Sequence, residues 1–218
     1  MTNRSIFLAV ASVAVLAFAG SASAQDSGLY GSINIGATDV GSTNAFNLSP
    51  SGTVVDLRVG DVLYNGDFTV AVEAGAMLGE VAAERVIPTC TFGICGYDEF
   101  DTEHRQVDWS GSFGLRVGHS FGPVTAYVTG GVRIAKMTES SSYDSGGVYP
   151  TWKYEQTGYV VGTYVGAGLS YPLGDRFSAT LAYERSNLTR MSWSSTWGSG
   201  TTGFEQETLT AGLVWAFK

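Results

Sequence analysis

From residue 29 to the end of the chain, apolar and polar residues alternate with a period of two. This pattern is typical of β-strands that have one apolar face and one polar face. Within 68–78, the side chains of Phe68 and Val70 share one face, whereas that of Glu73 falls on the other. Alternation dominates over helical spacing, so we expect an all-β fold. The pattern predicts eight strands, at 29–37, 55–59, 68–78, 107–117, 126–134, 159–171, 177–184 and 208–217.

The connections between these strands alternate between short and long. The short ones, at 61–66, 120–123 and 172–175, contain the Gly, Pro, Asn and Asp residues that form tight turns. The long ones cover 38–53, 80–104, 138–155 and 187–205. This arrangement predicts an eight-stranded antiparallel up-and-down barrel, with tight turns at one end and long loops at the other. Both chain ends are expected at the tight-turn end.

The two faces of the predicted strands differ sharply in charge. The apolar face has no charged residue in the middle of any strand, and the charged residues lie on the polar face. A soluble barrel would place the apolar face inside, around a ligand, and would leave Gly, Ser, Ala and Thr as its outer surface. We therefore expect the apolar face to contact lipid, as in a transmembrane β-barrel. The polar face would then hold an interior charge network of Asp56, Arg58, Glu73, Asp108, Arg116, Arg133 and Glu184.

The width of the barrel bears on whether it conducts. Eight strands leave an interior just wide enough for side chains to fill it. Tyr127 and Tyr164 fall on the same interior face as the charged residues. We expect an ion-paired plug that closes the barrel. A narrow channel for small solutes is the alternative, because numerous interior Gly and Ala residues leave space.

The first 24 residues have the features of a secretory signal peptide. Arg4 gives a positive start, 6–20 is an apolar stretch, and Ala22 and Ala24 fit the small-residue cleavage pattern. We expect cleavage after Ala24. The chain then divides into a signal peptide at 1–24 and an outer-membrane β-barrel at 25–218.

Composition excludes several classes of protein. Charged residues make up only 15% of the chain, and the formal net charge of −8 with no basic stripe argues against a nucleic-acid partner. Two Cys and two His argue against a structural zinc site. We expect no catalytic residues, no metal and no cofactor.

Three stretches carry a resemblance to a known family: 111–121, 165–173 with 181–185, and the closing strand. In these stretches the chain resembles the small outer-membrane β-barrels of Gram-negative bacteria, the OmpA-like and opacity-type barrels. The resemblance implies outer-membrane lipid, lipopolysaccharide and the outer-membrane assembly machinery as partners. It also implies that the C-terminal alternation is an assembly signal, here followed by Lys218. The residues of that signal are Leu213, Trp215 and Phe217.

The functional expectation that follows is a non-catalytic barrel. It would contribute to envelope integrity and, through its four long loops, to interactions at the cell surface. Trp193 and Trp197, in the stretch 187–205, favour such contacts because Trp is over-represented at interfaces. They would equally serve as part of an aromatic girdle.

Cys90 and Cys95 enclose four residues within the second long loop. In an exported chain with two Cys, a disulfide that closes the loop is the expected outcome. Redox catalysis or metal binding is the alternative, but the spacing is not C-x-x-C and no His adjoins the pair. The surrounding loop is acidic, which predicts a solvated surface or a divalent-cation site.

Some eight-stranded outer-membrane barrels modify lipid A with Ser, His and an acidic residue, which gives an enzymatic alternative. His104 is the one imidazole expected near the outer rim, and spacing reveals no Ser partner for it. His119 and Ser120 are neighbours in a strand and point to opposite faces. We therefore expect no enzyme.

Overall fold

The computed structural model describes residues 28–42, 49–65, 67–91, 94–144, 152–195 and 198–217. The predicted signal peptide lies outside these residues. Among them, no helix is long and apolar enough to cross a membrane.

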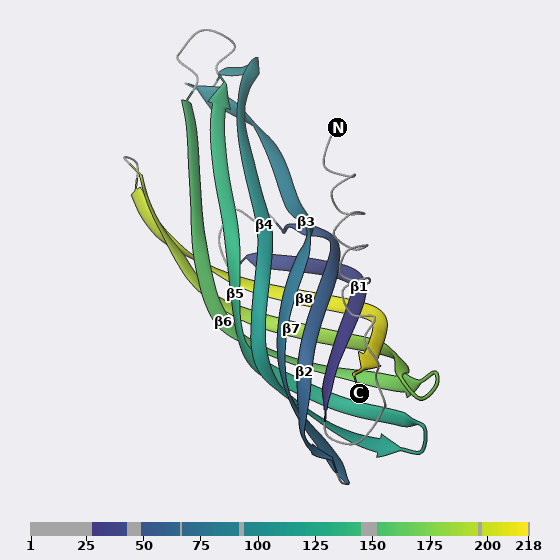
Figure 1. Ribbon diagram of the computed structural model, residues 1–218. Helices are drawn as coiled ribbons and strands as arrows, with labels where there is room; N and C mark the ends of the chain where they lie inside the picture. The colour runs from purple at the N-terminus through teal and green to yellow at the C-terminus, as the bar shows by residue number, and fades with distance from the viewer. Residues whose placement is uncertain are drawn as a thin grey trace.

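The described residues form the predicted closed barrel, in which each strand pairs antiparallel with the next and β1 pairs with β8 (Figure 1). The prediction of an eight-stranded antiparallel up-and-down barrel is confirmed. The strands are β1 (Leu29–Ser42), β2 (Ser51–Asn65), β3 (Phe68–Thr91), β4 (Ile94–Phe121), β5 (Val124–Asp144), β6 (Trp152–Pro172), β7 (Phe177–Ser195) and β8 (Gly198–Ala216).

One end of the barrel carries the tight turns and both described chain ends. The backbone N–H of Phe217 donates to the carbonyl of Leu29 at 2.8 Å, which joins the end of the chain to its first strand. Gly122 forms the β4–β5 turn with φ 63°, a conformation that favours glycine because it has no Cβ. In barrels of this kind the tight turns face the periplasm.

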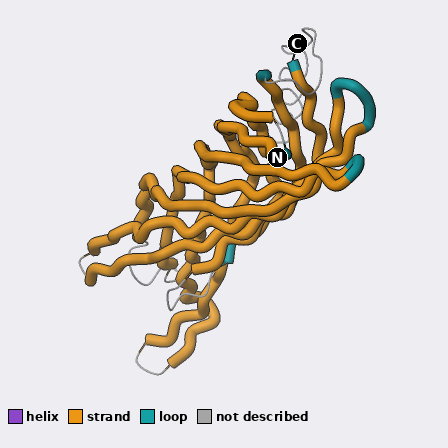
Figure 2. Tube along the Cα trace, turned by 90° about the horizontal axis from the view of Figure 1, so that it is seen from below, coloured by secondary structure: helices purple, strands orange, loops and turns teal. Residues whose placement is uncertain are grey.

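The long connections at the other end are mostly continued β-ladder, so the prediction of four long loops was wrong in extent. The β3–β4 pairing continues to Thr91 and Ile94, and the β7–β8 pairing continues to Ser195 and Gly198. Outside the membrane both faces of a strand can meet water, so these segments lose the alternation that marks a half-buried strand. Figure 2 shows the hairpins as extended ribbons.

The hairpins do not form one continuous wall. The β6–β7 pairing runs from Gly162 and Leu188 to the tight-turn end. Beyond that point the β7–β8 ribbon separates from the sheet formed by β3 to β6 (Figure 1). The barrel therefore presents a four-stranded sheet and a separate two-stranded ribbon at this end.

The outer surface of the closed part is an apolar band. Phe113, Val128 and Val165 are 58%, 59% and 65% exposed, which water would penalise and lipid accepts. On β6 the band extends from Tyr159 to Tyr171, about 28 Å along the membrane normal for a strand tilted by about 45°. This height is close to the ~25 Å apolar band of outer-membrane barrels.

Candidate functional site

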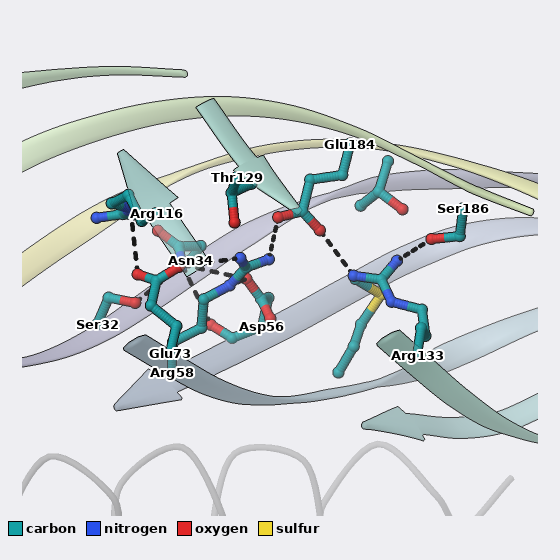
Figure 3. Close-up of polar contacts among 12 residues, drawn as sticks. Ser32, Asn34, Asp56, Arg58, Glu73, Arg116, Thr129, Arg133, Glu184 and Ser186 are labelled. Carbon is teal, nitrogen blue, oxygen red and sulfur yellow. Dashed lines mark hydrogen bonds and ion pairs between the residues drawn. The ribbon is translucent and has the colours of Figure 1, made fainter. Parts of the chain in front are cut away.

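Charged side chains from five strands meet inside the barrel (Figure 3). Arg58 Nε lies 2.7 Å from Asp56 Oδ2, and Arg58 Nη2 lies 2.6 Å from Glu184 Oε1. The second oxygen of Glu184 binds Arg133 Nη2 at 2.7 Å. Arg58 is on β2 and Glu184 is on β7, so this ion pair joins strands that are not neighbours. It therefore crosses the lumen.

Glu73 on β3 is the central residue of the other half of the cluster. It accepts a hydrogen bond from the Tyr30 hydroxyl at 2.7 Å, and its carboxylate lies 3.2 Å from Arg116 Nε and 3.8 Å from Arg58 Nη1. The Arg116 guanidinium stacks over the Tyr127 ring, 3.9 Å from its centroid, in a cation–π contact. Arg58 thus links the two halves into one network.

Neutral groups add hydrogen bonds to the network. The Asn34 amide donates to Asp56 Oδ2 at 3.3 Å, and Arg133 donates to the Ser186 hydroxyl at 2.7 Å. The six central residues balance three guanidinium groups against three carboxylates. Buried ion pairs of this kind add little net stability, but the loss of one partner leaves a costly unpaired charge. The network therefore ties the strands to one arrangement.

Asp108 departs from the expected interior network. The β4–β5 register shifts between Val107 and Trp109, which is the position of a β-bulge. The Asp108 carboxylate instead binds Lys136 Nζ at 3.0 Å and accepts from the Thr138 hydroxyl at 3.3 Å, in a partly exposed setting. An extra residue in one strand reverses the face on which the following side chains lie, and the sequence pattern alone does not reveal this.

Interior tyrosines pack against glycines on other strands. The pairs are Tyr30 with Gly60, Tyr127 with Gly168 and Tyr164 with Gly114. A Cβ on Gly168 would overlap the phenol ring of Tyr127, so the ring fits only because glycine is there. The Tyr127 hydroxyl also shares a 3.0 Å hydrogen bond with Thr180 on β7.

An apolar layer fills the interior on the hairpin side of the charges, and the sequence analysis missed it. Its members share near-complete burial: Val40, Val54, Met77, Val81, Val107, Ala135, Met137, Val160, Leu188 and Phe204. Arg105 covers this layer, 5.3 Å from the Phe204 ring centroid, and pairs with Glu139 at 2.7 Å. Val107 was expected on the lipid face. The bulge at Asp108 turns it inward, and a residue-by-residue count that allowed for bulges could have found it.

The two cysteines are opposite each other in the backbone register of the β3–β4 hairpin. Their side chains lie outside the described part of the structure, as do those of Trp193 and Trp197. Opposite residues in an antiparallel ladder have Cβ atoms roughly 4.5–5.5 Å apart, near the distance a disulfide needs. The Cys90–Cys95 disulfide remains a prediction.

His104 lies on the outer face of the β4 extension. Its Nδ1 is 4.0 Å from a Glu84 oxygen, and its Nε2 is 3.4 Å from Gln106 Oε1. The register places Ser140 directly across from His104 on β5, a relation that spacing along the chain cannot reveal. Both ring nitrogens of His104 therefore lie near other side chains, those of Glu84 and Gln106.

His119 lies at the tight-turn end and is likewise apart from a serine. Its Nδ1 is 2.5 Å from the Asp67 carbonyl, whereas the Ser120 hydroxyl shares a 2.9 Å hydrogen bond with Thr125. Among the residues that the structure describes, no three His, Cys, Asp or Glu side chains come together as a metal site.

The closing strand packs against the first strand. The Trp215 ring covers Gly31, so that a Cβ there would be 2.8 Å from Trp215 Cζ2. Trp215 and Phe217 make an edge-on ring contact with centroids 6.0 Å apart, and Leu213 is exposed on the lipid face. These positions seal the seam between β8 and β1. Their expected role as an assembly signal remains a prediction.

The fold and the interior define a transmembrane β-barrel whose lumen is filled by its own side chains. The family described as "outer membrane protein beta-barrel domain" matches residues 5–217. The chain belongs to this family, which locates it in the bacterial outer membrane. A search of curated proteins found no match.

Solved structures with a similar fold include small outer-membrane barrels. Ail, the attachment invasion locus protein of Yersinia pestis, is 16% identical, with 86% of this chain and 99% of that chain covered and a TM-score of 0.44. Neisserial surface protein A is 14% identical, covering 87% and 97%, with a TM-score of 0.43. The N-terminal barrel of Pseudomonas aeruginosa OprF is 15% identical, covering 85% and 97%, with a TM-score of 0.37.

Proposed function

We propose that this protein is a non-catalytic, non-conducting outer-membrane barrel that contributes to envelope integrity and presents its hairpins for interactions at the cell surface. The observation that carries the proposal is the filled lumen. A network of six charged residues crosses it, and an apolar layer lies above the network. A protein built to pass solutes would need a continuous wet path, which two such layers oppose.

The hairpins support the surface role. The β3–β4 and β5–β6 ladders extend well past the apolar band as a paired sheet, and the β7–β8 ribbon extends separately. Long ladders hold side chains in fixed positions, which lowers the entropy lost when a partner binds. Lipopolysaccharide around the band and a surface ligand at the hairpins are the partners we infer.

Planar-bilayer recording tests the closed lumen. The purified barrel should give no large, steady conductance, at most small and rare events. A stable conductance from the monomer would overturn the proposal.

Cells that lack the protein should become more sensitive to detergent. Cells that express a variant with residues 86–100 replaced by a two-residue turn should keep detergent resistance but bind less to host or bacterial surfaces.

The non-catalytic assignment has a separate test. His104→Ala should leave the lipid A composition of the cell unchanged, because His104 faces Gln106 and Glu84. An altered lipid A profile would instead favour an acyl-transfer or hydrolytic role for His104 together with Ser140.

We also infer that the chain is exported by the segment 1–24, cut after Ala24. The closing strand, with Leu213, Trp215 and Phe217, would then be read during assembly. N-terminal sequencing of the outer-membrane form should begin at Gln25. Phe217→Ala should lower the amount of assembled barrel without lowering its export to the periplasm.

A further inference from the structure

A groove crosses the lipid-facing surface over β3 to β8 near the tight-turn end. It has a volume of about 610 Å³ and an almost wholly apolar lining that includes Phe121, Ala126, Ala167, Leu181 and Leu209. None of its lining residues is Lys, Arg, Asp or Glu. The groove lies within the apolar band, so lipid is the medium that fills it.

Small residues beside large ones create the groove. Ala126 faces Leu169 across the β5–β6 ladder, and Ala167 faces Val128 in the same way. The two alanines therefore form a low floor between larger side chains on both strands. In hydrocarbon, the gain from binding comes from close packing, because lipid chains are as apolar as the protein surface. A concave floor of this kind gives an acyl chain more contacts than the convex surface elsewhere.

One end of the groove is polar. His119 lies between the rings of Phe68 and Phe121, with centroid distances of 4.9 and 4.7 Å. Its Nδ1 is hydrogen bonded to the carbonyl of Asp67, so Nδ1 must carry the proton. In the neutral ring, Nε2 is then an acceptor. Asp67, whose carbonyl makes this contact, belongs to the β2–β3 turn, and its exposed side chain carries a carboxylate at the same end of the barrel.

We propose that this groove is a binding site for one phospholipid with a primary ammonium headgroup, taken from the periplasmic leaflet. The acyl chain lies along Ala126 and Ala167, and the ammonium donates to His119 Nε2 and to the Asp67 carboxylate. Two acceptors beside a lining without Lys or Arg match a donor-rich cation better than an anionic headgroup. The site stands whether or not the lumen conducts.

Native mass spectrometry tests the site. The barrel is transferred from vesicles of phosphatidylethanolamine, phosphatidylglycerol or phosphatidylcholine with identical acyl chains into a mild detergent, and bound lipid is counted. The wild type should retain phosphatidylethanolamine about fivefold more than either of the others, which corresponds to about 1 kcal/mol, the net value of one hydrogen bond. The quaternary headgroup of phosphatidylcholine has no N–H donor and serves as the reference.

Variants separate the two parts of the site. Ala167→Phe fills the floor and should lower retention of all three lipids. His119→Ala should lower the preference for phosphatidylethanolamine while leaving one bound chain. Ala74→Phe is the matched control, because Ala74 is exposed in a smaller groove over β8 and β1 to β3, and it should change nothing. Each variant is first checked for folding by its heat-dependent shift on a gel.

Three results would overturn the proposal. Equal retention of the three lipids by the wild type would mean that no headgroup is recognised. An equal loss of lipid in Ala74→Phe and Ala167→Phe would mean that the groove is ordinary annular surface. A dimer mass without bound lipid, converted to a monomer by Ala167→Phe, would assign the groove to a second copy of the chain.

Discussion

Glu184 is the residue on which the interior network depends most. Its two oxygens bind different arginines, Arg58 at 2.6 Å and Arg133 at 2.7 Å. Each guanidinium is buried, so the loss of one carboxylate leaves two positive charges less compensated. A single side chain therefore couples β2, β5 and β7.

Glu184→Gln should lower the free energy of unfolding by about 3–5 kcal/mol, the usual cost of breaking a buried ion pair. The measurement is urea unfolding of the barrel in lipid vesicles, followed by tryptophan fluorescence. Glu155→Gln is the control, since Glu155 pairs with Lys153 on the exposed surface and should change the free energy by about 1 kcal/mol or less. Equal effects in the two variants would contradict the interior role of Glu184.

The Tyr127–Gly168 contact predicts that two glycine-to-alanine substitutions have different effects on the stability of the barrel. Gly168→Ala should destabilise the barrel by about 1–3 kcal/mol, because the new methyl group would force the Tyr127 ring from its position. Gly130→Ala, on the lipid face with its nearest neighbour at 3.4 Å, should be neutral or stabilising, since glycine weakens strands. The same unfolding experiment compares the two, and destabilisation of similar size by both would show that ring packing is not the cause.

At the scale of single strands, alternation located the parts of the chain that have different environments on their two faces. The stretch 159–171 of β6 was predicted correctly because lipid and the interior demand opposite residues there. The stretch 94–104 of β4 was expected as loop. Charged and polar residues follow one another there, with Glu103 and His104 next to the buried Arg105, so no apolar period marks the strand. Asp108 and Val107 were misplaced because a bulge shifts the register without changing composition.

Cross-strand partners were also beyond the reach of the sequence. Periodicity assigns a residue to a face, but it does not say which residue faces it from the next strand. The Arg58–Glu184 pair and the position of Ser140 opposite His104 both depend on register and on closure of the barrel. The charge balance was foreseeable, whereas the individual pairs were not.

The β3–β4 hairpin provides a prediction at the element scale. The register places Cys90 opposite Cys95 near its tip, so the two thiols should be oxidised to a disulfide in the exported protein. Alkylation followed by intact mass analysis should show no labelled thiol before reduction and two after it. Labelling of two thiols without reduction would contradict the disulfide. Cys90→Ser with Cys95→Ser should leave the barrel folded, because this tip lies far from the interior network along both strands.

For the whole molecule, the order of the layers matters more than any one contact. Tyr30 and Tyr127 lie toward the tight turns, the six charges lie in the middle, and the apolar layer lies toward the hairpins. Each layer uses residues from several strands, so together they fix the shape of the closed barrel. Lipid meets only the outer apolar band, and we propose that the charged layer and the apolar layer separate the two sides of the membrane.

The charged layer and the apolar layer lie one after the other along the lumen. We therefore expect that a cavity in only one of them does not let ions through the barrel. Arg133→Ala alone would open space in the charged layer, and Phe204→Ala alone would open space in the apolar layer, where Phe204 is 1% exposed. Each single variant should stay at the background conductance of the wild type in planar bilayers, because the other layer still excludes ions. The double variant should show discrete conducting steps.

Folding of all three variants is checked by the heat-dependent gel shift, so that a disordered chain is not mistaken for an open one. If Phe204→Ala alone conducts as well as the double variant, the charged network does not seal the lumen and the apolar layer is the only barrier. If Arg133→Ala alone does so, the network is the only barrier. If both layers exclude ions, neither single variant conducts and the double variant does, because ions must pass both barriers in sequence.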